Sequence, residues 1–253
     1  IKFKSFSESI FNKITAAYPQ NKDTKKYLSE LKVNKIKNLG NLKLIENTHD
    51  KRDDIDNKLN IQFQKYKTWI AASTHTNEEV FCAKAHINLK KKNKKLITII
   101  IPRHIHRVQD IISKIKNLNL KVATHSSKVK TLKDIDIYIV DTFGDSNKFF
   151  KISNTVLMGK FLVSKGSQNP LEAARYGAKI LHGPNIDNFK DVFKLLESLK
   201  ISKKITSIRQ LITAITFKKD MGRALKIKKI GVSILEKTLK ELEIYIDNEP
   251  KKT

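Results

Sequence analysis

Four short apolar segments of the sequence are each followed at once by residues that could bind an anion or transfer a proton. These residues are Ser73, Thr74 and His75 after the first segment, Pro102, Arg103 and His104 after the second, Asp141, Thr142, Phe143, Gly144 and Asp145 after the third, and Gly159, Gly166, Asn169, Pro170, Leu171 and Glu172 after the fourth. An arginine can hold a phosphate through two parallel hydrogen bonds. Glycine-rich approaches to helix N-termini also suit phosphate, and a glutamate in a first helical turn can accept hydrogen bonds from ribose hydroxyls. The pattern therefore predicts a nucleotide-type ligand.

Several of these residues also have structural interpretations, and the sequence leaves both open. His75 lies near Glu78 and Glu79, which suggests either a general base or the cap of a helix. Arg103 could bind an anion or form an ion pair with Asp110.

Glycine and acidic positions are ambiguous in the same way. Gly159 and Gly166 either admit a ligand or adopt a left-handed backbone in a loop. Glu172 either binds a ligand or complements a helix dipole. His104 and His106 have no obvious third ligand, so we expect no metal site.

The apolar segments alternate with stretches of helical periodicity. We expect strands at residues 69–73, 96–101, 135–140, 155–158 and 178–181, and helices at residues 78–89, 108–118, 170–176, 187–199, 207–217 and 221–242. Short, β-branched strands that are apolar throughout are typical of a parallel sheet covered by helices on both faces. In such a sheet the ligand binds outside the carboxyl ends of the strands, which is where the polar residues gather.

The formal net charge of +26 narrows the classes of partner. The basic residues are 45 lysines and only six arginines, whereas nucleic-acid sites favour arginine forks and interleaved aromatic residues. We therefore interpret the charge first as a general property of the surface, then as attraction to an anionic membrane or substrate, and expect no nucleic acid.

The sequence lacks the usual signals of several other classes of protein. No apolar run reaches the roughly 18 residues of a membrane helix, and we read no secretory signal. The single cysteine, Cys82, allows no intrachain disulfide, and its mid-helix position predicts packing rather than catalysis. There is neither a Walker loop nor a G-x-G-x-x-G motif.

In combination, the motifs resemble those of one known family. They run in order along nearly the whole chain: residues 40–43, 69–75 with Glu78 and Glu79, 102–107, 141–145, 166–174, and 183–184 followed by Asn188 and Phe189. This series resembles 3-deoxy-D-manno-octulosonic acid (Kdo) transferase, a glycosyltransferase of the GT-B architecture with Rossmann-like domains. Each motif alone is weak, but the ordered set is specific.

The resemblance implies transfer of Kdo from CMP-Kdo to a lipid A precursor during lipopolysaccharide biosynthesis, at the cytoplasmic face of the bacterial inner membrane. It implies no cofactor and no metal. The implied CMP contacts are Pro102, Arg103, Phe143, Gly144, Asp145, Asn169, Pro170, Leu171 and Glu172, and the additional donor-site candidates are Ser73, Thr74, His75, Gly159 and Gly166.

The sequence departs from the family pattern at several of these positions. Phe143 and Asp145 replace a methionine and a glutamate, Lys160 and Phe161 follow Gly159 where the family has glycine and serine, and Ser167 replaces a glycine. A side chain at position 167 could crowd a phosphate, so these changes bear on donor affinity.

Residues 1–45 hold too few elements to build their own sheet. By the resemblance, we expect them to be the tail of an N-terminal acceptor domain, and residues 46–253 to be the donor-binding domain with closing C-terminal helices. No residue matches the glutamate that serves as the family's general base, so we expect no transferase activity from this chain alone. The alternatives are another GT-B sugar-nucleotide transferase or epimerase, and a basic protein that binds RNA or anionic lipid.

Overall fold

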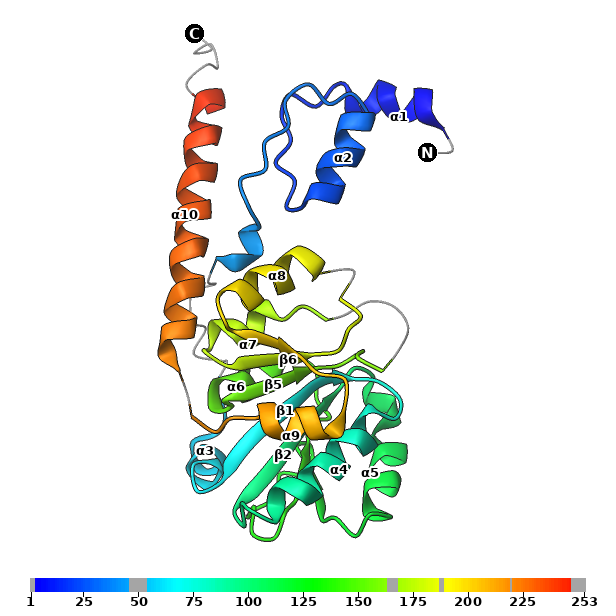
Figure 1. Ribbon diagram of the computed structural model, residues 1–253, viewed down its shortest axis with the longest axis vertical. Helices are drawn as coiled ribbons and strands as arrows, with labels where there is room; N and C mark the ends of the chain where they lie inside the picture. Colours follow the sequence, from blue (N-terminus) through cyan, green and yellow to red (C-terminus); the bar gives the residue numbers. More distant parts are fainter. Residues whose placement is uncertain (1–2, 46–53, 163–167, 187–188, 219, 247–253) are drawn as a thin grey trace. The chain divides into compact units, whose positions relative to one another are not determined.

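The computed structural model describes residues 3–45, 54–162, 168–186, 189–218 and 220–246 (Figure 1). The chain divides into two compact units, one comprising Ile1–Asn47 with Lys226–Thr253 and the other Thr48–Leu225. The first boundary lies close to the expected one after residue 45. The C-terminal residues, however, group with the N-terminal segment and not with the sheet, whereas a single unit over 46–253 was expected.

The larger unit is an α/β domain. Its described residues form a seven-stranded sheet in the order β3-β4-β2-β1-β5-β6-β7, and every neighbouring pair is parallel. The strands are β1 (Lys67–Thr74), β2 (Leu96–Pro102), β3 (Val122–Thr124), β4 (Ile137–Ile139), β5 (Thr155–Met158), β6 (Lys179–His182) and β7 (Ser202–Lys204). The predicted α/β fold with a parallel sheet is confirmed.

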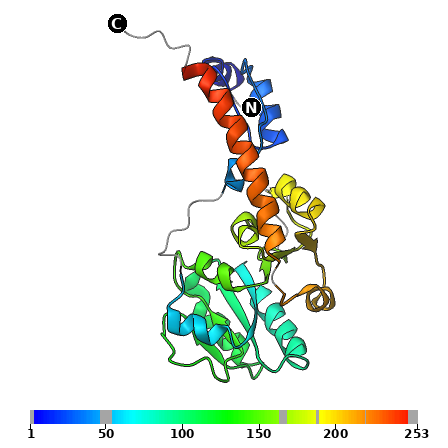
Figure 2. The ribbon, with the colours of Figure 1, turned by 90° about the vertical axis from the view of Figure 1, so that its left-hand side faces the viewer.

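Helices cover both faces of this sheet. They are α3 (Asn57–Phe63), α4 (Glu78–Lys90), α5 (Val108–Lys116), α6 (Ser146–Ile152), α7 (Leu171–Arg175), α8 (Lys190–Ser198) and α9 (Ile208–Ala214). Figure 2 shows α3 and α4 on opposite sides of the strands. Helices α4, α5, α6, α7 and α8 each connect one strand to the next, whereas the chain passes from β3 to β4 without a helix.

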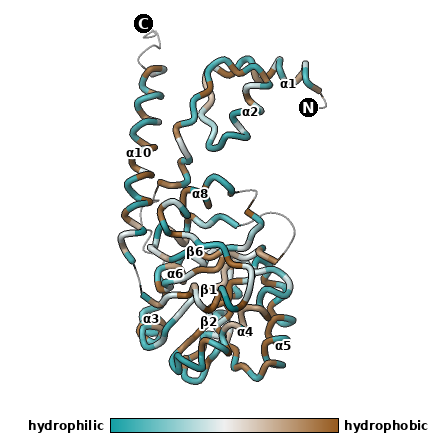
Figure 3. Tube along the Cα trace, viewed as in Figure 1, coloured by the Kyte–Doolittle hydropathy of each residue, from teal (hydrophilic) through white to brown (hydrophobic). Residues whose placement is uncertain are grey.

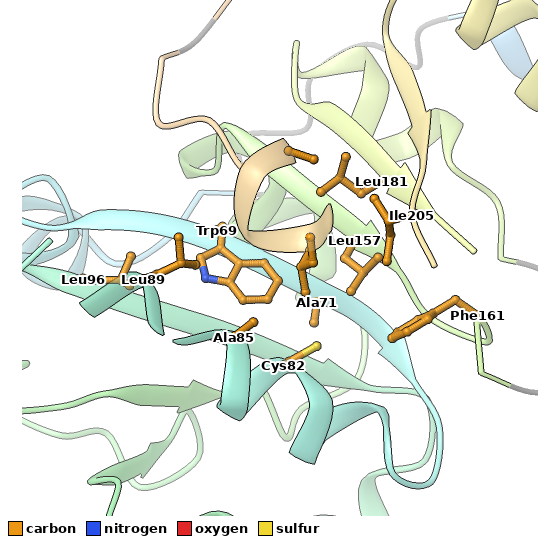
Figure 4. Close-up of a cluster of buried hydrophobic side chains, with 12 residues drawn as sticks. Trp69, Ala71, Cys82, Ala85, Leu89, Leu96, Leu157, Phe161, Leu181 and Ile205 are labelled. Atoms are coloured by element: carbon orange, nitrogen blue, oxygen red, sulfur yellow. The ribbon is translucent and has the colours of Figure 1, made fainter. Parts of the chain in front are cut away.

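One face of the sheet packs against α4, α5 and α9. Trp69 and Ala71 of β1 point to this face and meet Cys82 and Ala85 of α4 (Figure 4). Cys82 is fully buried, which confirms its expected packing role, and burial raises the pKa of its thiol. Farther along, Ile137 and Ile139 pack against α5.

The opposite face carries an aromatic cluster. The rings of Phe63, Tyr138 and Phe149 lie 5.2 to 6.2 Å apart and join α3, β4 and α6. Tyr138 lies between Ile137 and Ile139 on β4, so the strand alternation sends it to the other face. The period-2 pattern of each buried strand therefore divides the core between two helical layers.

The smaller unit contains α1 (Lys4–Phe11), α2 (Lys22–Glu30), a 3-10 turn at Leu42–Leu44 and the C-terminal part of α10 (Met221–Ile246). Hydrophobic and hydrophilic residues alternate along α10 (Figure 3). Gly231 lies so close to the 3-10 turn that a Cβ would stand 2.5 Å from the Leu44 carbonyl oxygen, and Glu241 pairs with Lys37 at 2.5 Å. In the described residues, no helix is both long enough and apolar enough to cross a membrane.

Candidate functional site

The chain changes direction across the sheet between β1 and β5. From β1 it proceeds through α4 to β2 on one side, whereas from β5 it proceeds through α7 to β6 on the other. The loops that follow β1 and β5 therefore begin side by side at the carboxyl edge and lead in opposite directions across the sheet. Such a switch point is where open α/β sheets bind ligands.

Ser73 and Gly159 bring these two strand ends into close contact. The register of β1 against β2 shifts between Ala72 and Thr74, and Ser73 adopts a left-handed φ of 55°. The Gly159 N–H donates to the Ala72 carbonyl at 2.7 Å. Gly159 does not have a positive φ, so close backbone approach, not loop conformation, accounts for glycine there.

Glu78 fastens the loop after β5 to the loop after β1. It lies fully buried in the first turn of α4. Its carboxylate accepts hydrogen bonds from the backbone N–H groups of His75 (2.9 Å), Lys160 (2.8 Å), Phe161 (2.6 Å) and Leu162 (2.9 Å). Burial raises the pKa of Glu78, although these four donors oppose the shift.

Glu79 fastens β1 to the segment after β2. Its carboxylate accepts a hydrogen bond from the Thr74 hydroxyl at 2.9 Å and two from the Arg107 guanidinium at 3.1 and 3.2 Å. The bidentate geometry is the strong form of this pairing. Glu78 and Glu79 therefore hold three loops of the carboxyl edge in fixed positions.

His75 lies two residues before Asn77, the N-cap residue of α4, so it is not itself the cap. Its backbone N–H donates to the Glu78 carboxylate at 2.9 Å, which ties it to the first turn of that helix. Its ring meets the His104 ring edge-on at 5.8 Å, and its Nε2 is buried without a hydrogen-bond partner among the described residues. Burial first, and then the charges of His104, Lys160 and Arg107, lower the pKa of His75.

Arg103 lies exposed just after β2, where Pro102 is buried. Its backbone N–H donates to the Thr74 carbonyl at 3.0 Å, which places it beside the end of β1. Asp110 pairs instead with Lys114 at 2.7 Å. Within the described residues no ion pair involves the Arg103 guanidinium, so the Asp110 alternative is wrong.

Residues 141–145 form the loop after β4. Phe143 is 81% exposed, and Gly144 adopts a φ of 81°. The Asp145 carboxylate accepts the Thr142 hydroxyl and pairs with Lys148 at 2.6 Å, while Asp141 accepts the Ser126 N–H at 2.8 Å. Both carboxylates are therefore engaged by residues that follow β3 or β4 at the carboxyl edge of the sheet.

The segment before α7 has mixed exposure. Asn169 Oδ1 accepts the Leu171 N–H at 3.1 Å, so it caps the helix as its position suggests. Pro170 and Leu171 are buried, whereas Glu172 is exposed and available to solvent or ligand. Gly166 and Ser167 lie outside the described residues.

The structure brings the ends of β1, β2 and β5 into one hydrogen-bonded edge. The sequence marked Lys160 only as a departure from the family pattern, and it gave no role to His125. In the structure the Lys160 N–H donates to Glu78, and His125, just after β3, has its Nδ1 2.9 Å from the Tyr138 hydroxyl. The place of Lys160 immediately after the strand-end Gly159 was a usable signal. His125 follows a three-residue strand that gave no clear pattern.

Comparison with known proteins identifies relatives, although no family model matches the chain. It is 27% identical over 249 residues to a 3-deoxy-D-manno-octulosonic acid transferase from Rickettsia felis, covering 97% of this chain and 53% of the relative. The chain is related to the Kdo transferases. It spans about half the length of the curated relatives it matches.

Two further proteins are similar to this chain. A bifunctional glycosyltransferase/methyltransferase from Fusobacterium nucleatum is 29% identical over 225 residues, covering 85% of this chain and 34% of that protein. The solved C-terminal CMP-Kdo binding domain of WaaA from Acinetobacter baumannii aligns with a TM-score of 0.57 at 19% identity, covering 69% of this chain and 90% of that domain. The latter similarity supports the fold, which is of the GT-B type.

Proposed function

We propose that this chain supplies the CMP-Kdo binding part of a transferase that moves Kdo to a lipid A precursor in lipopolysaccharide biosynthesis. Its similarity to 3-deoxy-D-manno-octulosonic acid transferases of Rickettsia species supports the proposed reaction. Its structural similarity to the CMP-Kdo binding domain from Acinetobacter baumannii supports CMP-Kdo as the proposed donor. We assign donor binding to the α/β unit, residues 48–225.

The observation that carries this proposal is the place of Arg103. Its guanidinium lies exposed at the carboxyl edge, without an ion pair among the described residues, beside the end of β1. A phosphate bound there would receive two charge-assisted hydrogen bonds. The same positive charge would stabilise the nucleotide phosphate as it leaves, which requires no metal.

The remaining CMP contacts that we propose fall on the same edge. Glu172 is exposed in the first turn of α7 and can accept ribose hydroxyls. Asn169 and Pro170 set the start of that helix, and Leu171 anchors it in the core. Phe143, Gly144 and Asp145 contribute as a loop, with the Phe143 ring free to cover a bound base.

We place the acceptor chemistry at a membrane surface. The charge of +26 favours an anionic membrane. The proposed location is the cytoplasmic face of the bacterial inner membrane.

Calorimetric titration of the purified chain with CMP and with UMP tests the donor proposal. We expect CMP to bind and UMP to bind much more weakly. Arg103→Ala should lose at least tenfold in CMP affinity, which corresponds to about 1.4 kcal/mol. Arg209→Ala, which removes an exposed arginine from α9, should bind CMP like the unchanged chain.

Thermal melting of the same samples separates binding from folding. A folded chain that binds no CMP contradicts the proposal. Equal affinity for CMP and UMP favours a GT-B enzyme that uses another sugar nucleotide.

A further inference from the structure

We propose that Lys160 binds the phosphate of the nucleotide donor, in an anion subsite that it forms with Arg103 around the end of β1. The inference rests on the proposed function and names a residue that carries its recognition. Two observations support it: the position of Lys160 relative to β1 and the balance of charge around it. Its backbone conformation supplies the test.

Backbone hydrogen bonds place Lys160 beside His75. The N–H groups of both residues donate to the same oxygen of Glu78, at 2.8 and 2.9 Å. On the other side of β1, the Arg103 N–H donates to the Thr74 carbonyl at 3.0 Å. Lys160 and Arg103 therefore flank the end of β1, two strand spacings or about 10 Å apart. Side chains of their length can reach one phosphate between them.

The charge balance at this place favours an anion. The Glu79 carboxylate is matched by Arg107, and Glu78 is buried and bound by four backbone N–H groups. No ion pair among the described residues involves the ammonium group of Lys160. The unmatched charges around the end of β1 are therefore those of Lys160 and Arg103.

The pKa of His75 agrees with an excess of positive charge at this place. After burial, its pKa is lowered chiefly by neighbouring positive charges, among them Lys160, and Glu79 opposes them. Lys160 is thus close enough for its charge to act on this ring. A phosphate bound here would also meet the unpartnered Nε2 of His75.

The backbone at Lys160 is one that a side chain disfavours. Its φ of 68° lies in the left-handed region, where glycine is the ordinary residue. The hydrogen bond to Glu78 holds this conformation. Replacing Lys160 by glycine therefore removes the side chain without adding backbone strain, and the same holds at Lys200, whose φ is 58°.

Lys160→Gly gives a clean test, because it removes the ammonium group while relieving the backbone. Lys200→Gly is the matched control, since Lys200 also has a left-handed φ, of 58°, but lies before β7 at the amino edge of the sheet. We expect Lys160→Gly to weaken CMP binding about tenfold or more with an unchanged or higher Tm. Lys160→Arg should retain most of the affinity, and Lys200→Gly should bind CMP like the unchanged chain.

Titration with inorganic phosphate distinguishes the subsite from the nucleotide. If CMP binds equally well to the unchanged chain and to Lys160→Gly, the subsite is wrong and the donor proposal stands. A second outcome is that phosphate binds, that its affinity falls in Lys160→Gly but not in Lys200→Gly, and that CMP binds no better than phosphate. In that case the subsite stands and the donor proposal is wrong. Equal losses in Lys160→Gly and Lys200→Gly indicate a general charge effect and contradict the subsite. If the folded chain binds neither probe, both proposals are wrong.

Discussion

The backbone of Gly159 lies against the carbonyl group of Ser73 so closely that a Cβ on Gly159 would stand 2.1 Å from the Ser73 oxygen. Real Cβ atoms do not approach a backbone oxygen so closely. The contact joins the ends of β1 and β5 at the point where the chain changes direction across the sheet. The shape of the candidate site therefore depends on the absence of one methyl group.

Gly159→Ala should lower the free energy of unfolding by about 3 kcal/mol, because two strand ends must separate to admit the methyl group. Urea denaturation followed by circular dichroism measures the change. Gly144→Ala is the control: its φ of 81° is unfavourable for alanine, but no atom lies within 4 Å of the added Cβ, so the loss should be about 1 kcal/mol. Equal losses at the two positions would show that close approach is not the cause at Gly159.

Arg107→Met should destabilise the larger unit by about 3 kcal/mol, because it leaves the Glu79 carboxylate buried without its partner. Adding Glu79→Gln should restore most of that loss, since the uncompensated charge is then gone. Lys114→Met breaks the exposed pair with Asp110 and should cost no more than about 0.5 kcal/mol. A double variant no more stable than Arg107→Met would contradict this explanation.

The stability of the chain should fall as the pH drops through 6.5. Burial lowers the pKa values of His75, His125 and His182 below their ordinary value of 6.5. The unfolded chain therefore binds protons more readily than the folded chain, and the free energy of unfolding decreases with falling pH. Denaturation midpoints at pH 7.5, 6.5 and 5.5 measure this slope.

His182→Asn isolates one contribution to that slope. The Asn side chain can replace the 2.7 Å hydrogen bond from Nδ1 to the Gly183 carbonyl, but it does not titrate. The variant should show a shallower loss of stability between pH 6.5 and 5.5. The single variant separates His182 from Glu78. Burial raises the pKa of Glu78, so its protonation increases the free energy of unfolding as the pH falls. An unchanged slope would exclude His182 as a contributor.

Asp136→Asn should cost about 2 kcal/mol. The Asp136 carboxylate accepts the Lys121 N–H at 2.8 Å and pairs with Lys90. Burial alone would raise the pKa of this carboxyl, but His86, Lys90 and Lys121 together hold it well below its ordinary value of 3.8. Its contribution is therefore present above about pH 3.8 and is lost as the pH falls further.

Asp134→Asn provides the comparison for Asp136. Asp134 and Lys121 form an exposed pair at 3.8 Å, which should contribute less than about 0.5 kcal/mol. Urea denaturation at pH 7 measures both variants. If the two substitutions have equal effects, the buried network around Asp136 is not the source of its stabilisation.

Most of the sheet could be predicted because its strands are continuous apolar runs. Residues 155–158 were assigned with the observed bounds of β5, and residues 96–101 differ from β2 only by Pro102. The helices α3 and α6 were not predicted. Each has seven residues and contains several polar side chains, and each forms because Phe63 or Phe149 packs against Tyr138. Such helices depend on tertiary contacts that a local pattern does not contain.

The edge strands were missed for a related reason. β3 and β7 have three residues each, and β7 includes two exposed lysines. Their backbone groups pair with β4 and β6, so their conformation is set by the neighbouring strand. A short segment with few apolar side chains carries too little information to predict that pairing.

The sequence by itself determined the α/β class and the edge of the sheet at which polar residues gather, because strand period and strand-end chemistry are local properties. Only the tertiary structure decided what each polar residue does there. Glu78 and Glu79 proved to join loops, Asp145 to pair with Lys148, and Arg103 to remain without an ion pair among the described residues. These outcomes depend on distances between residues far apart in the chain, which only the packing of helices on the sheet establishes.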